Sequence, residues 1–337
     1  MLWVRKHWPL QTFLSAALVS ISSIAFALVT MPLLAQDREP IVPVPRSIKL
    51  DPARVSLGQR LFGDVRLSRD KNLSCASCHP LEHGGMDGLP VAKSSVAGPH
   101  LRNTLTVFNV GLSSTYNWDG VTDSLERHTN LVLLNPALMN ISWSEVLKRM
   151  NADTGYVSAF RSAYSQGLTR STVLDAIATF ERSLLTPNSR FDRYLRGEPD
   201  ALATREKEGY RLFKAYGCVS CHQGVNVGGN LYQKFGVFKE MIPIERSPSD
   251  LGRFRITKAS RDRHVFRVPS LRNVAVTPPY FHDGREPKLK EAVNTMAKAQ
   301  LGRSLKDDES SQIAAYLKTL TGEYHGKQLI GPASGSD

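Results

Sequence analysis

The sequence predicts a mostly α-helical protein made of two similar halves, and three observations support this. Apolar residues recur at helical spacing in several stretches, while strand signals are sparse. A pentapeptide with two cysteines and a histidine occurs twice, and short motifs recur in the same order around both copies. The stretches around the pentapeptides are rich in Gly, Pro and Ser, which predicts long ordered loops. The length of 337 residues fits two domains.

All four cysteines lie in the two pentapeptides, Cys75-Ala-Ser-Cys78-His79 and Cys218-Val-Ser-Cys221-His222. Cys-x-x-Cys-His is the attachment signature of c-type haem, in which the thiols bond to the porphyrin and the imidazole binds the iron. A zinc site made of Cys-x-x-Cys pairs needs no histidine directly after each pair. A thioredoxin-like motif normally occurs once, near a βαβ pattern that this sequence lacks. The sequence therefore predicts two covalently bound haem c groups, on which the long loops pack.

Five stretches have the apolar spacing of amphipathic helices. They are residues 144–150, 172–185, 203–216, 289–301 and 307–320. Ser171 is the expected N-cap of the second stretch, and Pro187 follows its end.

Three pairs of short motifs recur in the same order in the two halves. Their residues are 58–62 and 209–213 (GQRLF and GYRLF), 101–103 and 271–273 (LRN in both), and 118–120 and 282–284 (WDG and HDG). Each motif is weak alone, but their shared order predicts that one haem-binding unit was duplicated.

The amino terminus predicts export from the cytoplasm. Residues 8–36 carry no charge, and Arg5 and Lys6 precede them. Residues 1–36 fit a cleaved signal peptide and an N-terminal membrane anchor equally well, and anchoring would run through residues 10–35. Either case places the rest of the chain on the periplasmic side.

The net charge is +12, but Lys and Arg are scattered along the chain. They form no stripe with interleaved aromatic residues, so we expect no nucleic-acid partner. A surface with some preference for acidic partners is the simpler interpretation.

The chain resembles the bacterial dihaem cytochrome c peroxidases and their MauG-type relatives, over roughly residues 45–322. The motifs that carry the resemblance are LGQRLFGDVRLSRDKNLSCASCH, WDG, AIATFERSLLTPNSRFDRYLRGE, VPSLRNVAVTPPYFHDG and AVNTMAKAQLG. The resemblance implies two cytochrome-c-like domains, each with one covalent haem. These are an N-terminal peroxidatic domain (45–185) and a C-terminal electron-transfer domain (186–325), followed by a flexible tail (326–337).

For the C-terminal haem, the resemblance implies His222 as the proximal iron ligand and Met296 as the opposite ligand. Imidazole plus thioether raises a haem's reduction potential, which suits an electron acceptor. Met296 could instead be a core residue of an amphipathic helix, which is the commoner fate of methionine. The family's MauG-type members have a tyrosine at this place, so a methionine favours the peroxidase type.

The resemblance implies further roles near the domain boundary. Trp118 matches a tryptophan that lies between the two haems as an aromatic bridge, although a packed core indole would look the same in sequence. Asn103, Thr277 and Pro279 match positions that bind one calcium ion, the last two through carbonyl oxygens, and oxygen ligands suit calcium.

The N-terminal haem keeps His79 as proximal ligand but departs from the family's distal pattern. Ser95 stands where the family has a removable distal histidine, and Leu138 stands where it has an acid–base glutamate. His128 replaces a distal glutamine, and three interpretations stay open. It could move protons, since its unperturbed pKa is near neutrality. It could bind the iron, or it could be an exposed helix residue without a role.

Other residues are weaker candidates at the two haems. His83 and His100 could fill the vacant distal position, and Glu145 could replace the missing carboxylate if the loop 129–145 is rearranged. The resemblance also places three basic residues in a segment that contacts haem propionates, namely Arg267, Arg272 and His282.

The resemblance implies a periplasmic enzyme that reduces hydrogen peroxide to water. Electrons would come from a small cytochrome c or copper protein, and family members are often homodimers. A MauG-like enzyme that oxidises residues of a partner protein is the second hypothesis. The third is a non-catalytic electron carrier or redox sensor, with His128 bound to the first iron.

Overall fold

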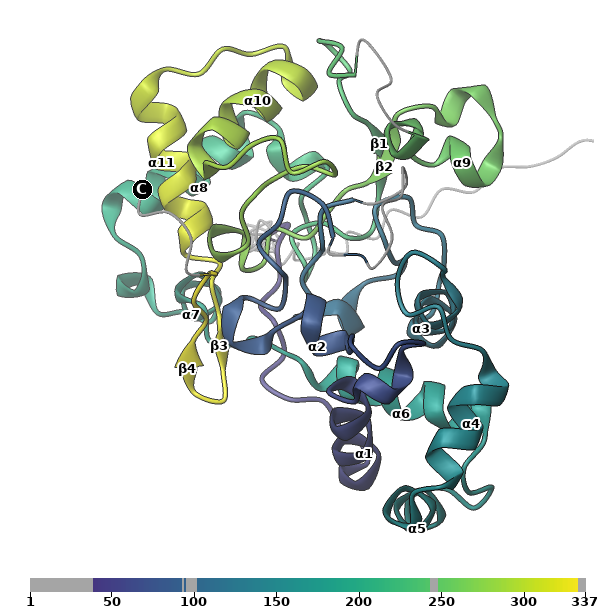
Figure 1. The fold of residues 1–337 in the computed structure, drawn as a ribbon. Helices are drawn as coiled ribbons and strands as arrows, with labels where there is room; N and C mark the ends of the chain where they lie inside the picture. Colours follow the sequence, from purple (N-terminus) through teal and green to yellow (C-terminus); the bar gives the residue numbers. More distant parts are fainter. Residues whose placement is uncertain (1–38, 93, 95–101, 243–247, 333–337) are drawn as a thin grey trace, which may run out of the picture. The chain divides into compact units, whose positions relative to one another are not determined.

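The structure is a computed structural model, and it describes residues 39–92, 94, 102–242 and 248–332. These residues are mostly helical and form one compact unit (Figure 1). The strands are short: β1 (Tyr232–Lys234) pairs antiparallel with β2 (Val265–Arg267), and β3 (Glu323–Tyr324) pairs with β4 (Lys327–Gln328). The predicted fold class, mostly α with long loops, is therefore confirmed.

The described residues contain eleven α-helices. In the first half they are α1 (Pro52–Phe62), α2 (Cys75–Cys78), α3 (Leu125–Leu134), α4 (Trp143–Asn151), α5 (Thr154–Ala163) and α6 (Arg170–Ser183). In the second half they are α7 (Arg190–Leu195), α8 (Thr204–Ala215), α9 (Phe254–Thr257), α10 (Leu289–Leu301) and α11 (Asp307–Lys318). Among the short 3-10 helices, η2 (Leu81–His83), η3 (Val110–Leu112), η5 (Cys218–Ser220) and η8 (Val274–Val276) lie near the candidate site.

All five predicted helices are present, as α4, α6, α8, α10 and α11. One detail was wrong: the N-cap of α6 is Thr169, not Ser171. The hydroxyl of Thr169 accepts a hydrogen bond from the backbone N–H of Thr172 (3.2 Å), and the hydroxyl of Thr172 accepts one from the N–H of Thr169 (2.9 Å). This reciprocal pair satisfies two N–H groups at the helix start, which a cap at Ser171 would leave open.

Membrane spanning by the amino terminus stays a prediction, because residues 10–35 lie outside the described part of the chain. Within the described part, none of the helices has the length and apolar character needed to cross a bilayer.

Each half has its own apolar core. In the first half, Leu61, Phe160 and Ile177 belong to a fully buried cluster around α1, α5 and α6. In the second half, Phe191 and Tyr316 belong to a cluster around α7, α8 and α11. These separate cores fit two haem domains, although the boundary at residues 185 and 186 stays a prediction.

The two halves repeat one helix pair, as the GQRLF and GYRLF motifs predict. α1 packs on α6 in the first half, and α8 packs on α11 in the second. Gly58 and Gly209 lie at the equivalent contacts. A Cβ atom on Gly58 would lie 2.0 Å from the carbonyl oxygen of Ala176, and one on Gly209 would lie 2.0 Å from that of Gln312. Only glycine allows the backbones to approach this closely.

The structure corrects the predicted pairing of the two LRN motifs. Asn109 and Asn273 both have a left-handed backbone (φ 58° and 62°) and begin η3 and η8. The N–H of Asn109 donates to the carbonyl of Leu184 (2.7 Å), and that of Asn273 donates to the carbonyl of Leu320 (3.2 Å). The equivalent of residues 271–273 is therefore 107–109, not 101–103, because structural role rather than letter identity defines the repeat.

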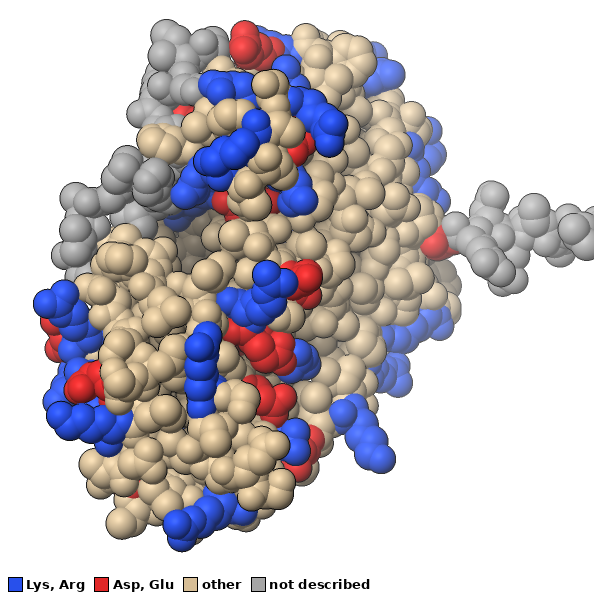
Figure 2. All heavy atoms as spheres, turned by 90° about the vertical axis from the view of Figure 1, so that its right-hand side faces the viewer, with Lys and Arg blue, Asp and Glu red and all other residues tan. Residues whose placement is uncertain are grey.

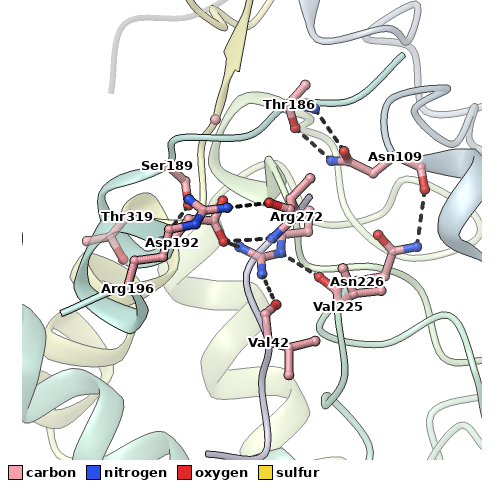
Figure 3. Close-up of polar contacts among 12 residues, drawn as sticks. Val42, Asn109, Thr186, Ser189, Asp192, Arg196, Val225, Asn226, Arg272 and Thr319 are labelled. Carbon is pink, nitrogen blue, oxygen red and sulfur yellow. Dashed lines mark hydrogen bonds and ion pairs between the residues drawn. The ribbon is translucent and has the colours of Figure 1, made fainter. Parts of the chain in front are cut away.

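Thr186 joins these two asparagines across the halves, and Figure 3 shows its bonds to Asn109. Its hydroxyl lies 2.7 Å from Nδ2 of Asn109 and 3.0 Å from Nδ2 of Asn273, and both amides donate to it. Asn109 in turn accepts from the N–H of Thr186 (2.9 Å) and, through its carbonyl, from Nδ2 of Asn226 (3.2 Å). All four side chains are buried. We call Asn109, Thr186, Asn226 and Asn273 the asparagine node.

A buried ion pair lies beside this node in Figure 3. Nη1 of Arg272 lies 2.8 Å from Oδ1 of Asp192, and both side chains are almost fully buried. The guanidinium also donates to the carbonyls of Val225 and Val42, each at 2.8 Å. This pair fastens the first described segment and the loop after the second pentapeptide to α7. Removing one partner of such a pair leaves an uncompensated buried charge.

The close contact at Gly58 predicts a large loss of stability in the variant Gly58→Ala. Because the new methyl group would overlap a backbone carbonyl, α1 and α6 must separate, at a cost of about 3 kcal/mol. Gly63→Ala is the control, since the nearest atom to its Cβ is 3.9 Å away. We expect the control to change the free energy of unfolding by less than about 1 kcal/mol. Denaturant unfolding of both variants measures this, and equal stabilities would contradict the packing argument.

Candidate functional site

Each pentapeptide lies at a cavity. The N-terminal cavity, of about 580 Å³, is lined by Cys75, Cys78 and His79. The C-terminal cavity, of about 230 Å³, is lined by Cys218, Cys221 and His222. In each half, the two cysteines and the histidine of the pentapeptide therefore lie together on the wall of one cavity, and cavities are where proteins usually bind cofactors.

The two pentapeptide histidines are oriented by backbone carbonyls. Nδ1 of His79 lies 3.0 Å from the carbonyl oxygen of Gly85, and Nδ1 of His222 lies 3.3 Å from that of Val227. A carbonyl only accepts, so Nδ1 carries the proton and Nε2 keeps its lone pair. Burial lowers the pKa of both imidazoles, that of His222 to about 4. A neutral imidazole held through Nδ1 is the usual arrangement of a histidine metal ligand.

The cysteines form no disulfide, and all four are partly buried. Burial raises the pKa of Cys75 to about 12 and that of Cys218 to about 11. Both thiols are therefore neutral at neutral pH. Two neutral thiols and a neutral imidazole beside a largely apolar cavity fit haem c.

Met296, from α10, lines the same cavity as His222. It is half-buried and packs against the cluster that contains Trp118 and Phe266, not in the main core of the second half. This position agrees with the predicted iron ligand, although ligation itself stays a prediction.

A wall separates the two cavities. Residues 103–106 together with Arg267 and Ser270 line both of them. Trp118 lines the C-terminal cavity, while its neighbours Asn117 and Asp119 line the N-terminal one. Its indole N–H donates to the carbonyl of Asn103 (2.8 Å), so the ring is fixed in this wall. Trp118 therefore lies where an aromatic bridge is predicted.

The three basic residues predicted to contact propionates have different surroundings. Arg267 lines both cavities and donates through Nε to the carbonyl of Asn117 (2.8 Å). Burial lowers its pKa to about 10, which still leaves it cationic at neutral pH. His282 lines the C-terminal cavity with its Nε2 2.8 Å from Oδ1 of Asp250. For Arg272 the expectation was wrong, because it lines neither cavity and pairs with Asp192.

His128, on α3, lines the N-terminal cavity. Its ring stacks on Tyr116 with centroids 6.0 Å apart, and its Nδ1 is buried without a hydrogen-bond partner. Burial lowers its pKa to about 4, and His79 nearby also opposes its protonation. The interpretation as an exposed helix residue is therefore wrong. The neutral ring can accept a proton or a metal, but it is a poor proton donor at neutral pH.

The other distal candidates do not gather at this cavity. Leu138 lines it as an apolar side chain. His83 is exposed on η2, and Glu145 bonds to Arg149 (2.7 Å) away from the cavity, so neither replaces a distal group. Ser95 and His100 lie outside the described residues.

Sequence reasoning missed Glu181, on α6, which lines the N-terminal cavity. It is 8% exposed, its Oε2 has no hydrogen-bond partner, and burial raises its pKa to about 8. A signal was present: Glu181 lies four residues after Ile177 and seven after Leu174, on the apolar face of a predicted helix. An acid on that face is expected to be buried.

The predicted calcium residues Asn103, Thr277 and Pro279 all line the C-terminal cavity. Nδ2 of Asn103 donates to the carbonyl of Leu89 (2.9 Å). Among the described His, Cys, Asp and Glu residues, the group whose side chains lie close enough to share a metal ion is Asp250, His282 and Asp283, which are not the predicted calcium residues. Calcium binding stays a prediction.

Two family models match the chain in succession: "Di-haem cytochrome c peroxidase" over residues 52–200 and "Cytochrome c" over residues 206–321. Cytochrome c551 peroxidase of Nitrosomonas europaea is 40% identical, over 89% of this chain and 89% of the relative. Cytochrome c peroxidase Ccp of Escherichia coli is 39% identical over 85% of this chain, which spans only 62% of that longer relative. MauG of Methylorubrum extorquens is 33% identical over 86% of this chain and 85% of the relative.

Solved structures show the same architecture. A MauG-like protein associated with microbial copper homeostasis superposes with a TM-score of 0.72 at 29% identity, covering 84% of this chain and 93% of that one. The diheme peroxidase BthA of Burkholderia thailandensis superposes with a TM-score of 0.67 at 21% identity, covering 84% and 91%, and so supports the fold alone.

The position of Met296 predicts the effect of its removal. In Met296→Ala the C-terminal haem loses its thioether, so we expect a shift from low-spin towards high-spin absorption and a lower reduction potential. Met241→Ala is the matched control, because Met241 packs against the same cluster. Optical redox titration compares them. Unchanged spectra and potential in Met296→Ala would show that Met296 only fills space.

Proposed function

This chain belongs to the di-haem cytochrome c peroxidase family, and on that premise we propose that it reduces hydrogen peroxide to water with electrons from a small periplasmic donor. The unequal cavities support this most directly. His222 shares its smaller cavity with Met296, whereas His79 shares a larger one with His128, Leu138 and Glu181. The smaller, apolar cavity suits a haem that only passes electrons. The larger one has room and polar groups for a small polar substrate.

Haem and the protein side chains have different roles in this reaction. Bound haem supplies the one-electron and peroxide chemistry. The cysteines hold it covalently, and His79 and His222 orient it through Nε2. The buried cation of Arg267 suits the carboxylates of haem, with which it would form charge-assisted bonds. Trp118, fixed in the wall, provides an aromatic path between the cavities.

The reaction takes up two electrons and two protons for each peroxide. Electrons enter at the C-terminal cavity and cross the wall one at a time. Protons must reach the N-terminal cavity separately, through groups that line it. His128 is neutral at neutral pH, so its ring can accept a hydrogen bond from peroxide as it binds.

Oxidation of a partner protein, which the resemblance to MauG-type relatives implies, is the second candidate. Leu138 favours it, since leucine cannot replace the glutamate of the peroxidases. Met296 favours the peroxidase type. Identity to the peroxidases (39% and 40%) also exceeds that to MauG (33%).

The electron donor we propose is a small acidic cytochrome c or copper protein. Lys and Arg side chains gather around α9 on the face shown in Figure 2, and the exposed ones in and after this helix are Lys258, Arg261 and Arg263. Such a surface attracts an acidic partner and speeds its encounter. Export, with or without an anchor through residues 10–35, places the chain in the periplasm with such donors. One calcium ion at Asn103, Thr277 and Pro279, and a homodimer, complete the proposal.

The stoichiometry of turnover tests the proposed function. The holoprotein, mixed with peroxide and a reduced one-electron cytochrome c, should oxidise two donor molecules for each peroxide consumed. No donor oxidation, together with a long-lived oxidised form of the protein, would contradict the peroxidase proposal and favour oxidation of a partner protein.

Charge reversal at α9 tests the donor surface. Lys258 and Arg261 are exposed, so Lys258→Glu/Arg261→Glu should fold normally. We expect a roughly tenfold rise in KM for an acidic donor, a weaker dependence on ionic strength and an unchanged kcat. The control Arg69→Glu/Arg161→Glu makes the same charge change at exposed sites in the first half. Equal effects of both pairs would show that only net charge matters.

A further inference from the structure

Three residues at the N-terminal cavity have buried polar atoms: His128, whose Nδ1 has no hydrogen-bond partner, and Thr129 and Glu181, whose hydroxyl and carboxyl interact with each other without a well-formed hydrogen bond. All three residues line the cavity, from the adjacent helices α3 and α6. Burying an unpaired polar atom is costly, so such groups usually serve a ligand or bound water. The edge of a haem c ring is apolar, and it cannot satisfy a carboxyl oxygen there. Water or peroxide in the cavity can.

We propose that Glu181 is the acid that delivers protons to the N-terminal cavity, in place of the carboxylate that Leu138 cannot supply. The inference rests on the proposed function and names a further residue of that site. Glu181 lies on α6, whereas position 138 follows α3, so the acid reaches the same cavity from a different element. Thr129 interacts with the carboxyl of Glu181 and is the sequence neighbour of His128, so its hydroxyl is placed to pass a proton from Glu181 into the cavity.

The surroundings of Glu181 raise its pKa, so its carboxyl is mostly protonated at neutral pH. Burial is the main cause of its raised pKa, and the carboxylate of Glu126 adds to it, while Arg182 opposes it. The other titratable groups that face it are Cys75 and Tyr116. At neutral pH the side chain is a neutral acid beside a neutral imidazole. A donor and an acceptor with separated pKa values are what acid–base chemistry at one site requires.

A route for reprotonation begins next to Glu181. Its sequence neighbour Arg182 forms an ion pair with Glu126 (2.6 Å), and these side chains are about one third exposed (32% and 30%). Glu126 lies one helical turn before Thr129 on α3, so this pair connects the buried acid with solvent. The ion pair lies at the surface end of the route and Thr129 at its cavity end.

The proton balance is as follows. Cleavage of the O–O bond with two electrons and two protons gives two waters. Glu181 gives one proton to the departing oxygen, through Thr129 or a water, and becomes a carboxylate. After each delivery the carboxylate regains a proton from solvent past Glu126 and Arg182, so two deliveries supply the two protons and leave Glu181 protonated. The electrons come from the donor, so Glu181 itself is not oxidised or reduced.

Infrared spectroscopy of the oxidised holoprotein tests the protonation of Glu181 without turnover. We expect a carbonyl band of a protonated carboxylic acid that disappears above about pH 8 and is absent from Glu181→Gln. Stability gives a second readout. The folded state holds this proton more tightly than the unfolded chain, so wild type should lose stability relative to Glu181→Gln as pH rises from 4.5 through about 8.

Turnover tests the delivery of the proton. Glu181→Gln should lower kcat about 100-fold, with KM for the donor unchanged, and should remove the fall in kcat as pH rises through about 8. Glu181→Asp should restore part of the rate. Glu145→Gln is the control, since Glu145 does not line the cavity.

The outcomes separate this inference from the proposed function. Absence of peroxide turnover in wild type overturns the proposed function, and this inference with it. Normal wild-type turnover together with an unchanged rate and pH profile in Glu181→Gln overturns this inference alone. An infrared band that persists in Glu181→Gln overturns it as well.

Discussion

The asparagine node is the interaction on which the two-cavity arrangement depends. Asn109 and Asn273 each have a left-handed backbone, and the N–H of each bonds to the segment that follows the last helix of its half. Thr186 bonds to both asparagines, and its bonds to Asn109 are shown in Figure 3. Asn226, which follows the second pentapeptide, bonds to the carbonyl of Asn109. Asn109 and Asn226 also line the N-terminal cavity. Because the node is buried, breaking one of its hydrogen bonds would leave polar atoms without partners, which is energetically costly. The node therefore fixes the position of one half against the other.

The two cavities that the asparagine node holds in place differ in their chemistry. Both histidines are held through Nδ1 by a backbone carbonyl, and both pentapeptides present neutral thiols. The difference lies opposite the histidines. One cavity has a thioether and apolar walls, and the other has a neutral imidazole, a hydroxyl and a buried acid. The wall with Trp118 and Arg267 lies between them. A duplicated unit has thus kept its attachment chemistry and changed its distal groups.

The sequence predicted what depends on local patterns. The five helices follow from apolar spacing, and the structure confirms them. The repeated GQRLF and GYRLF motifs lie at equivalent helix contacts, as a duplicated unit requires. The sequence did not reveal the role of Arg272, because an arginine near a haem motif and one paired with a distant Asp192 look alike in sequence. The asparagine repeat was mispaired because identical letters outweighed backbone conformation. Helical periodicity could have predicted that Glu181 is buried. It could not have predicted the cavity beside Glu181, because that cavity forms only where α3 and α6 lie together in the fold.

The central claim is that the two haems are unequal, with an open iron at His79 and a fully ligated one at His222. Electron paramagnetic resonance of the fully oxidised holoprotein tests it most directly. The account predicts two signals, a high-spin one from the His79 haem and a low-spin one from the His222 and Met296 haem. A wholly low-spin spectrum would contradict it, because His128 or another side chain would then close the N-terminal site to peroxide.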